Sequence, residues 1–350
     1  MILTDDMLAV AFQYREMELW NSLADNDIFA FRLSDGEVGY CCVMGYGGEH
    51  FALGFYRGQK GFNSYLKTIR MNSMELSQLD MYDMITTMDY INCDFMQAAD
   101  MDAKVKKVIR RYAETHGLKI NRFNGWPDYT RHLPGKFADG IVRAKDASDI
   151  VEAMRAAIAV AEALKEYSPL QLGFDEAGEY PTQEGGKQVP YLIPNADGSY
   201  DWSTTELPAF LPVEWPAPVF DNDILAHKVK NFSEICGLQL RAFYLPSPLT
   251  DKGHEEVPLI TLLLCMDTVE GGVFPLFDAK MGDNQEQAIL TLLANWMCDN
   301  GHKPDQIEVA DDRTESLLKD FCNRCDIPLV RREKLEELEE SCQFMINEMM

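Results

Sequence analysis

The sequence predicts an α+β protein built from two domains. At 350 residues, the chain is longer than the roughly 250–300 residues at which a single hydrophobic core usually stops growing. Hydrophobic residues make up 46% of the chain and charged residues 25%, which is typical of globular proteins and supplies enough apolar material for two cores. Strand-like runs and helical periodicity occur in both halves, so each domain is expected to combine strands with helices.

The first domain is expected over residues 1–167 and contains an antiparallel meander with helices. Three strand-like runs cover 28–33, 38–44 and 51–56, and the Asp35-Gly36 pair between the first two is a strong hairpin signal. Because short turns join consecutive runs, we expect the three strands to pair in order. The remaining pattern predicts a strand over 90–95, irregular or strand-like structure over 118–143, and helices over 5–23, 62–71, 76–88, 101–116 and 147–166.

Residues 168–218 differ in composition from the segments on either side. Eight of the sixteen prolines lie here, together with eight acidic residues and one lysine. Proline removes a backbone donor and disfavours long helices, so this segment is predicted to be an acidic linker, with short strands around Tyr191 and Trp202. Its five large aromatic residues after Val189 indicate that it packs on something.

The second domain is expected over residues 219–350 and has a regular order of elements. Strand-like runs are followed by alternating helices and strands, which predicts an antiparallel ribbon continued by parallel strands with helical crossovers. This order, three strands and then α-β-α-β-α, resembles a ribonuclease H-like fold. The expected strands cover 238–245, 259–266, 272–277, 306–310 and 327–330, and the expected helices cover 284–300, 312–325 and 333–347.

Several features of the sequence indicate a reducing, cytoplasmic setting. Asp5 and Asp6 interrupt the apolar start and no basic region precedes it, so no secretory signal is expected. The longest apolar run, 257–266, is about half of what a bilayer crossing needs, so no membrane span is expected. Nine cysteines, an odd number, are interpreted as reduced thiols. The Cys322 and Cys325 pair falls at a predicted helix C-terminus and is interpreted as buried, without zinc.

Two segments resemble a known type of protein. The residues that carry the resemblance in the first half are Asp27 to Ala30, Asp35 to Tyr40 and Gly45 to Glu49, and the segment from Trp20 to Gly61 resembles the N-terminal domain of uncharacterised bacterial proteins. The segment from Gly301-His302-Lys303-Pro304 through Arg331 is similar to a second domain of unknown function that accompanies it. The resemblance implies a two-domain architecture and no particular activity.

The strand ends of the second domain are the positions expected for catalytic carboxylates. Ribonuclease H-like nucleases place carboxylates at the ends of the first and fourth strands, where two metal ions clamp a phosphodiester. The candidates here are Asp267 and Asp311, but the first strand carries no acid and has Arg241 as its charge. Helix capping, with Asp312 and Glu315 as a capping box, is the favoured explanation of the second candidate, and a turn before Gly271 is the favoured explanation of the first. No metal site or cofactor is therefore predicted.

One basic segment stands out in a chain of net charge −25. Between Lys104 and Lys145 there are eleven basic residues against three acids, a balance of +8, and the rest of the chain carries −33. Cations interleaved with aromatic rings suit phosphate contact and base stacking. The alternative is that the cations neutralise the acidic second half, either across the domain interface or in a dimer. The candidate binding residues are Lys104, Lys107, Arg110, Arg111, Arg122, Trp126, Tyr129 and Arg131.

Three functions remain open from the sequence. A non-catalytic binding or interaction protein leads, because no catalytic constellation is evident; its partner would be another protein or a second copy. A metal-dependent phosphodiesterase or nuclease of ribonuclease H-like fold is the first alternative. A nucleic-acid-associated accessory protein that uses the basic segment is the second, although the net charge of −25 opposes general binding to polyanions.

Overall fold

The chain forms two compact units, each assembled from three segments. The computed structural model describes residues 1–73, 76–175, 178–235, 237–245, 256–269, 271–278 and 284–349. The α+β class predicted from the sequence is confirmed, since both units combine helices with sheets. The first unit contains residues 1–75, 87–134 and 138–211, and the second contains 76–86, 135–137 and 212–350.

The first unit is built on one eight-stranded sheet. Its strands are β1 (Phe29–Arg32), β2 (Val38–Met44), β3 (Ala52–Arg57), β4 (Tyr90–Met96), β5 (Trp126–His132), β6 (Asp139–Gly140), β7 (Gln188–Pro194) and β8 (Tyr200–Glu206). Their order in the sheet is β6-β5-β4-β3-β2-β1-β7-β8. The expected meander is present as β1, β2 and β3, paired antiparallel. Gly36 turns the first hairpin with φ of 90°, a conformation that glycine adopts without strain.

The segment expected to be a linker, 168–218, is largely part of this sheet. β7 pairs parallel with β1 through Tyr191 and Leu192, and β8 pairs antiparallel with β7. The pairing with β1 lies between Pro190 and Pro194, so the donors that these prolines lack are not needed there. The short strands expected around Tyr191 and Trp202 therefore exist, and the first unit extends to residue 211.

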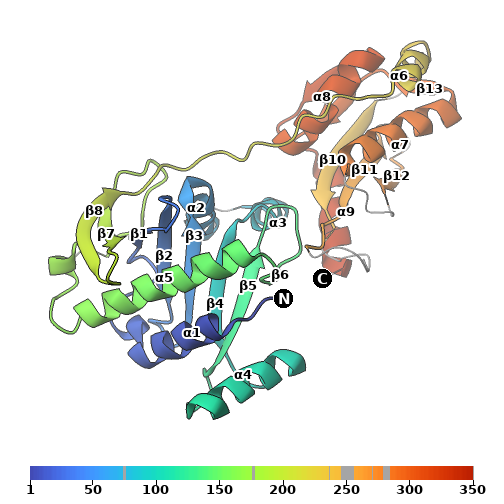
Figure 1. Ribbon diagram of the computed structural model, residues 1–350. Helices are drawn as coiled ribbons and strands as arrows, with labels where there is room; N and C mark the ends of the chain where they lie inside the picture. The colour runs from blue at the N-terminus through green and yellow to red at the C-terminus, as the bar shows by residue number, and fades with distance from the viewer. Residues whose placement is uncertain are drawn as a thin grey trace. The chain divides into compact units, whose positions relative to one another are not determined.

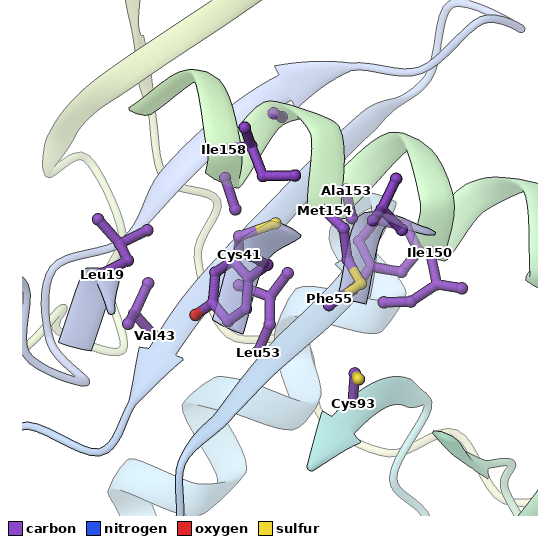
Figure 2. Packing of buried hydrophobic residues seen from close by; sticks show 14 of the residues in the cluster. Leu19, Cys41, Val43, Leu53, Phe55, Cys93, Ile150, Ala153, Met154 and Ile158 are labelled. Atoms are coloured by element: carbon purple, nitrogen blue, oxygen red, sulfur yellow. The ribbon is translucent and has the colours of Figure 1, made fainter. Parts of the chain in front are cut away.

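Two layers of helix cover the first sheet. Its long helices are α1 (Asp5–Met17), α2 (Gly58–Ser73), α4 (Ala103–His116) and α5 (Ala144–Ala163), with short 3-10 turns at Leu19–Asn21 and Leu170–Leu172. α1 and α5 lie on one face and α2 on the other (Figure 1). Figure 2 shows how α5 packs: Ile150, Met154 and Ile158 face the strand residues Leu53 and Phe55 in the buried core.

The second unit contains a five-stranded mixed sheet. Its strands are β10 (Leu238–Tyr244), β11 (Thr261–Asp267), β12 (Val273–Phe277), β14 (Ile307–Val309) and β15 (Leu329–Arg331). They lie in the order β12-β11-β10-β14-β15, with β12, β11 and β10 antiparallel and β10, β14 and β15 parallel. The predicted ribbon continued by parallel strands is thus present. A small separate sheet pairs β9 (Ser233–Ile235) with β13 (His302–Pro304).

Helices cover both faces of the second sheet. α6 (Asp223–Lys230), α7 (Gln285–Asn300) and α8 (Asp312–Cys325) pack on one face. α9 (Glu336–Met349) packs on the other, together with α3 (Gln78–Ile85). The sequence predicts α3 as a helix of the first domain, but Leu79 is buried in the cluster that contains Leu338 and Cys342 of α9. A helix from the first half of the chain therefore completes the core of the second unit.

Two further expectations concern thiols and membranes. The eight cysteines within the described residues are free; the ninth, Cys236, lies outside the described residues. Cys322 and Cys325 are buried, as expected, and burial raises the pKa of the Cys325 thiol to about 12. Neither thiol is therefore activated for redox chemistry. In the part of the chain that the structure describes, no helix is both long enough and apolar enough to cross a bilayer.

Candidate functional site

A buried arginine on the central strand of the second unit is the starting point of the site. Leu238, Leu240 and Ala242 of β10 face the cluster under α6, α7 and α8. Strand side chains alternate between faces, which places Arg241 on the opposite face, where Phe243 joins the cluster under α3 and α9. Arg241 is 4% exposed. A charge buried to this degree requires charged partners.

Two carboxylates from different elements supply those partners. Nη2 of Arg241 lies 2.5 Å from Oδ2 of Asp83 on α3, and Nη1 lies 3.2 Å from Oδ2 of Asp311 at the end of β14. Burial opposes the charge on Arg241, but Asp311 and Asp83 more than offset this, so its pKa stays above the ordinary value. The guanidinium is therefore a charged bridge between α3 and the β14–α8 connection.

Asp311 is held in place by the helix that it starts. Its Oδ1 accepts the backbone N–H of Thr314 at 2.8 Å, and its Oδ2 accepts the Thr314 hydroxyl at 2.6 Å. The same hydroxyl oxygen accepts the backbone N–H of Ala242 at 2.8 Å, a donor on β10 beyond the residues that pair with β14. The expected cap at Asp312 thus lies one residue earlier, at Asp311. Both oxygens of this carboxylate are already engaged by the protein.

Asp83 is the other carboxylate of the bridge, and its environment disfavours its charge. Burial raises the pKa of Asp83 to about 6, although the nearby guanidinium groups of Arg241 and Arg313 act in the opposite direction. Desolvation outweighs the attraction, as is common for buried ion pairs. The site therefore contains one carboxyl group that titrates close to neutral pH.

Two members of this charged bridge, Arg241 and Asp311, line a cleft of about 880 Å³. The cleft lies where β14 and β15 end and where α3 and α9 begin, which is the usual position of ligand sites beside parallel strands. Its volume falls within the range of small-molecule sites, about 300–1,000 Å³. The residues that line it are Ser77, Leu79, Asp80, Arg241, Ala310, Asp311, Asp312, Arg331, Arg332, Glu333, Lys334, Glu336 and Glu339.

Charges of both signs surround the opening of the cleft. Arg331 and Arg332 are exposed; Arg331 pairs with the exposed Asp312 at 3.1 Å, and Arg332 pairs with the buried Glu308. Nε of Arg241 has no hydrogen-bond partner among the described residues. This N–H is shielded from solvent, and an unpartnered buried donor costs free energy.

The structure does not bring the two candidate catalytic carboxylates together. Asp267 ends β11 and pairs with Leu238, the first residue of β10. Asp311 lies two residues after the end of β14, whose first residue, Ile307, pairs with the same Leu238. The two aspartates therefore lie at opposite ends of these strands, about 13 Å apart along the strand direction. Asp267 accepts the backbone N–H of Val269 at 2.7 Å, which fits the turn expected from the sequence.

The basic segment is divided by the structure into an exposed part and a buried part. Five of its candidate residues are exposed: Lys104, Lys107, Arg110, Arg111 and Arg122. Trp126 is 6% exposed and Tyr129 is buried, with its hydroxyl donating to the carbonyl of Met7 at 2.7 Å. Arg131 is largely buried and pairs with Asp89 at 2.7 Å. Both rings and Arg131 are thus core groups, which corrects the expectation that they offer a binding surface.

Sequence reasoning missed one residue of the site and underrated another. Asp83 lies in a helix whose pattern gives no sign that the helix belongs to the second unit. Arg241 was visible as a lone charge in the apolar run Leu238–Leu245, and such a charge requires a buried partner of opposite sign. That signal could have located the bridge, although it does not reveal which of the acids in the chain supplies it.

Comparisons with known proteins give two matches to domain families. Residues 5–181 match the family model described as domain of unknown function DUF7309, and residues 225–346 match that of domain of unknown function DUF6930. No curated protein matches the chain.

Among solved structures, the chain is similar to one titled "CryoEM structure of simian T-cell lymphotropic virus intasome in complex with PP2A regulatory subunit B56 gamma". The identity is 12%, with a TM-score of 0.24 over 34% of this chain and 42% of that chain. This chain therefore spans less than half of that one, and a score this low supports no conclusion about fold or function.

Proposed function

We propose that this chain, which belongs to the family of the domain of unknown function DUF7309, is a non-catalytic binding protein of the cytosol. Its binding site is the cleft of the second unit. The eight free cysteines among the described residues support a reducing compartment. The observation that carries the proposal is the Arg241 guanidinium bridging Asp83 and Asp311.

The second unit is proposed to be ribonuclease H-like, which makes the position of Arg241 informative. The sheet order β12-β11-β10-β14-β15 supports this assignment. In a nuclease of that fold, carboxylates of the first and fourth strands share metal ions. Here the first strand, β10, contributes a cation, and Asp311 after the fourth strand binds it directly. A guanidinium at this position occupies the oxygen that a metal would need.

The charges of the cleft indicate the class of ligand. Arg241 lines the cleft, and Arg331, Arg332 and Lys334 add cations at the opening. Asp80, Asp312 and the glutamates of the α9 side place carboxylates around the same opening. A complementary ligand must therefore carry both an anionic and a cationic group. Peptide segments and amino-acid derivatives have this character, whereas a polyphosphate has only one sign of charge.

The first test concerns catalysis. With Mg²⁺ or Mn²⁺ added, the melting temperature of the chain is expected to stay unchanged, and single-stranded DNA and an RNA–DNA hybrid are expected to stay intact. The physical reason is that both oxygens of Asp311 are engaged by Thr314 and Arg241. Calorimetric melting and gel assays measure these outcomes. Metal-dependent cleavage that disappears in Asp311→Asn would establish the nuclease alternative and reject our proposal.

The second test concerns the ligand class. In saturation-transfer NMR, the dipeptide lysyl-glutamate is expected to receive magnetisation from the protein, and alanyl-alanine is expected to receive much less. Replacing Glu336 and Glu339 with glutamine keeps the size of the side chains but removes two carboxylates at the opening, so it should weaken the transfer several-fold. Equal transfer to both dipeptides, or no effect of the double variant, would exclude the cleft as a site for ligands of mixed charge.

A further inference from the structure

The outer face of α4 carries cations that the first unit leaves unpaired. α4 packs its apolar side, Val105, Ile109 and Ala113, against α1 and β5 (Figure 1). Lys104, Lys107 and Arg111 stand at positions i, i+3 and i+7, a spacing that aligns them on one side of a helix. Among the described residues of the first unit, no carboxylate lies within 4.0 Å of these three cations.

This cationic stripe also has an apolar component. Val108 lies within the stripe and is 47% exposed. Exposed apolar groups among charges are typical of contact surfaces. The stripe therefore combines a positive charge with a small apolar centre.

The second unit presents a face of matching spacing and opposite charge. Glu337, Glu340 and Phe344 of α9 also stand at positions i, i+3 and i+7, and all three are exposed, Phe344 to 66%. Together with Val273 of the edge strand β12, they line a groove of about 400 Å³. Within the described part of the second unit, neither glutamate has a cation within 4.0 Å. This groove has an acidic border and an apolar interior.

We propose that the α4 stripe of one copy docks on the α9–β12 groove of a second copy of this chain. Helical residues rise about 1.5 Å each, so the three cations of α4 span the same length as the two glutamates and Phe344 of α9. Each copy carries both surfaces. The proposed assembly is a dimer in which a two-fold axis repeats the contact, so that both surfaces of each copy are used. The proposal is independent of the cleft and its ligand.

A polyanion is a poorer occupant of the stripe. The aromatic rings that would stack on bases, Trp126 and Tyr129, are buried, and the chain as a whole carries −25, which repels nucleic acid at long range. Every copy of the chain carries one acidic groove and one cationic stripe, so the two surfaces are present in solution at equal concentration. Charge complementarity and the shared spacing thus favour self-association.

Light scattering coupled to size exclusion on the full-length chain tests the proposal. At about 50 mM salt the mass is expected to be twice that of one chain, and it should fall toward one chain near 500 mM, because salt screens exposed ion pairs. Lys107→Glu with Arg111→Glu, and Glu337→Lys with Glu340→Lys, should each raise the dissociation constant about a hundredfold or more, since like charges then face each other.

A mixture of the two double variants is the decisive test of the docking contact. Each variant complements the other at both contacts, so an equimolar mixture should regain the mass of a dimer although neither partner dimerises alone. As a control of equal charge change, Lys60→Glu with Lys319→Glu, both exposed residues of other helices, should leave the dimer intact. Circular dichroism establishes that each variant is folded.

Three results would overturn the proposal. The first is a wild-type chain that keeps the mass of a monomer at low salt. The second is a mixture of the two double variants that stays monomeric. The third is salt-sensitive filter binding of single-stranded DNA by the wild type that disappears in Lys107→Glu with Arg111→Glu, which would assign the stripe to a polyanion.

Discussion

Replacing Arg241 with methionine is expected to lower the free energy of unfolding of the second unit by about 3–5 kcal/mol at pH 7.5, because removing one partner of a buried ion pair leaves the others uncompensated. Asp83 and Asp311 both lie within 3.2 Å of the guanidinium. Methionine has a similar length, so loss of packing contributes little. Urea unfolding followed by circular dichroism measures the change. A variant as stable as the wild type at this pH would refute the role that we assign to the bridge.

The loss of stability should depend on pH in a defined direction. The folded-state pKa of Asp83 is raised to about 6, above the value of about 3.9 in unfolded chains. The folded state therefore favours the protonated form, and the contribution of this group to stability is full below pH 4 and declines as pH rises through 6. Without Arg241 the pKa of Asp83 rises further. The difference between wild type and variant should then be larger at pH 7.5 than at pH 5.

Two further variants separate the bridge from a general effect of charge. Adding Asp83→Asn to Arg241→Met removes the buried negative charge, so part of the lost stability should return at pH 7.5. Arg331 pairs with Asp312 and Glu315 at the surface, at 3.1 and 3.0 Å. Replacing Arg331 with methionine is expected to change stability by less than about 1 kcal/mol, as is usual for exposed pairs.

The elements of the second unit could be predicted from the sequence, because each one has a clear pattern in its own short stretch of residues. Each strand is a short apolar run and each helix repeats its apolar residues at helical spacing, so β10, β11, β12 and α8 lie within one or two residues of their expected limits. Even the parallel continuation through β14 follows from the alternation of helices with strands. Periodicity identifies which side of an element is buried, and short connections then restrict how the elements pair.

The placement of α3 and β7 could not be predicted, because periodicity does not tell what an element is buried against. Leu79 gives α3 an apolar side that would suit either core. Tyr191 and Leu192 give β7 the alternation of a strand, but the parallel partner, β1, lies about 160 residues earlier in the sequence. The proline content of 168–218 suggested a linker, yet the prolines fall outside the two residues that pair with β1.

The candidate site shows the same limit more sharply. The position of Arg241 in an apolar strand indicates a buried charge. The position of Asp83 in an amphipathic helix gives no such indication. Trp126 and Tyr129, interleaved with cations, suggest base stacking, but the structure buries both rings, Trp126 in the cluster under α4 and Tyr129 in the cluster under α1 and α5. Residue type and spacing therefore identified Arg241 as a charge that needs a partner. They also placed a binding surface at Trp126 and Tyr129, which the structure buries.

A fragment of residues 219–350, the second domain as the sequence outlines it, is expected to lack a cooperative unfolding transition. It omits α3, and with it the Asp83 carboxylate that pairs with Arg241 and the Leu79 side chain that fills the α9 cluster. Losing a buried leucine costs about 2–5 kcal/mol, and leaving a buried charge without its partner costs about 3–5 kcal/mol. Their sum is comparable to the whole stability of a typical domain, about 5–15 kcal/mol.

Restoring α3 tests whether its absence is the cause. Residues 76–86 joined to 219–350 through a long glycine–serine linker return both groups to the fragment, and such a linker imposes little constraint on where the helix docks. This extended fragment should melt cooperatively and show dispersed amide NMR signals. The same extended fragment carrying Leu79→Ala and Asp83→Ala should lack cooperative melting, as the fragment 219–350 does. A fragment of 219–350 that melts cooperatively at the same temperature as the extended one would show that α3 is dispensable, because the remaining helices would then suffice to cover the face of the sheet that contains Arg241.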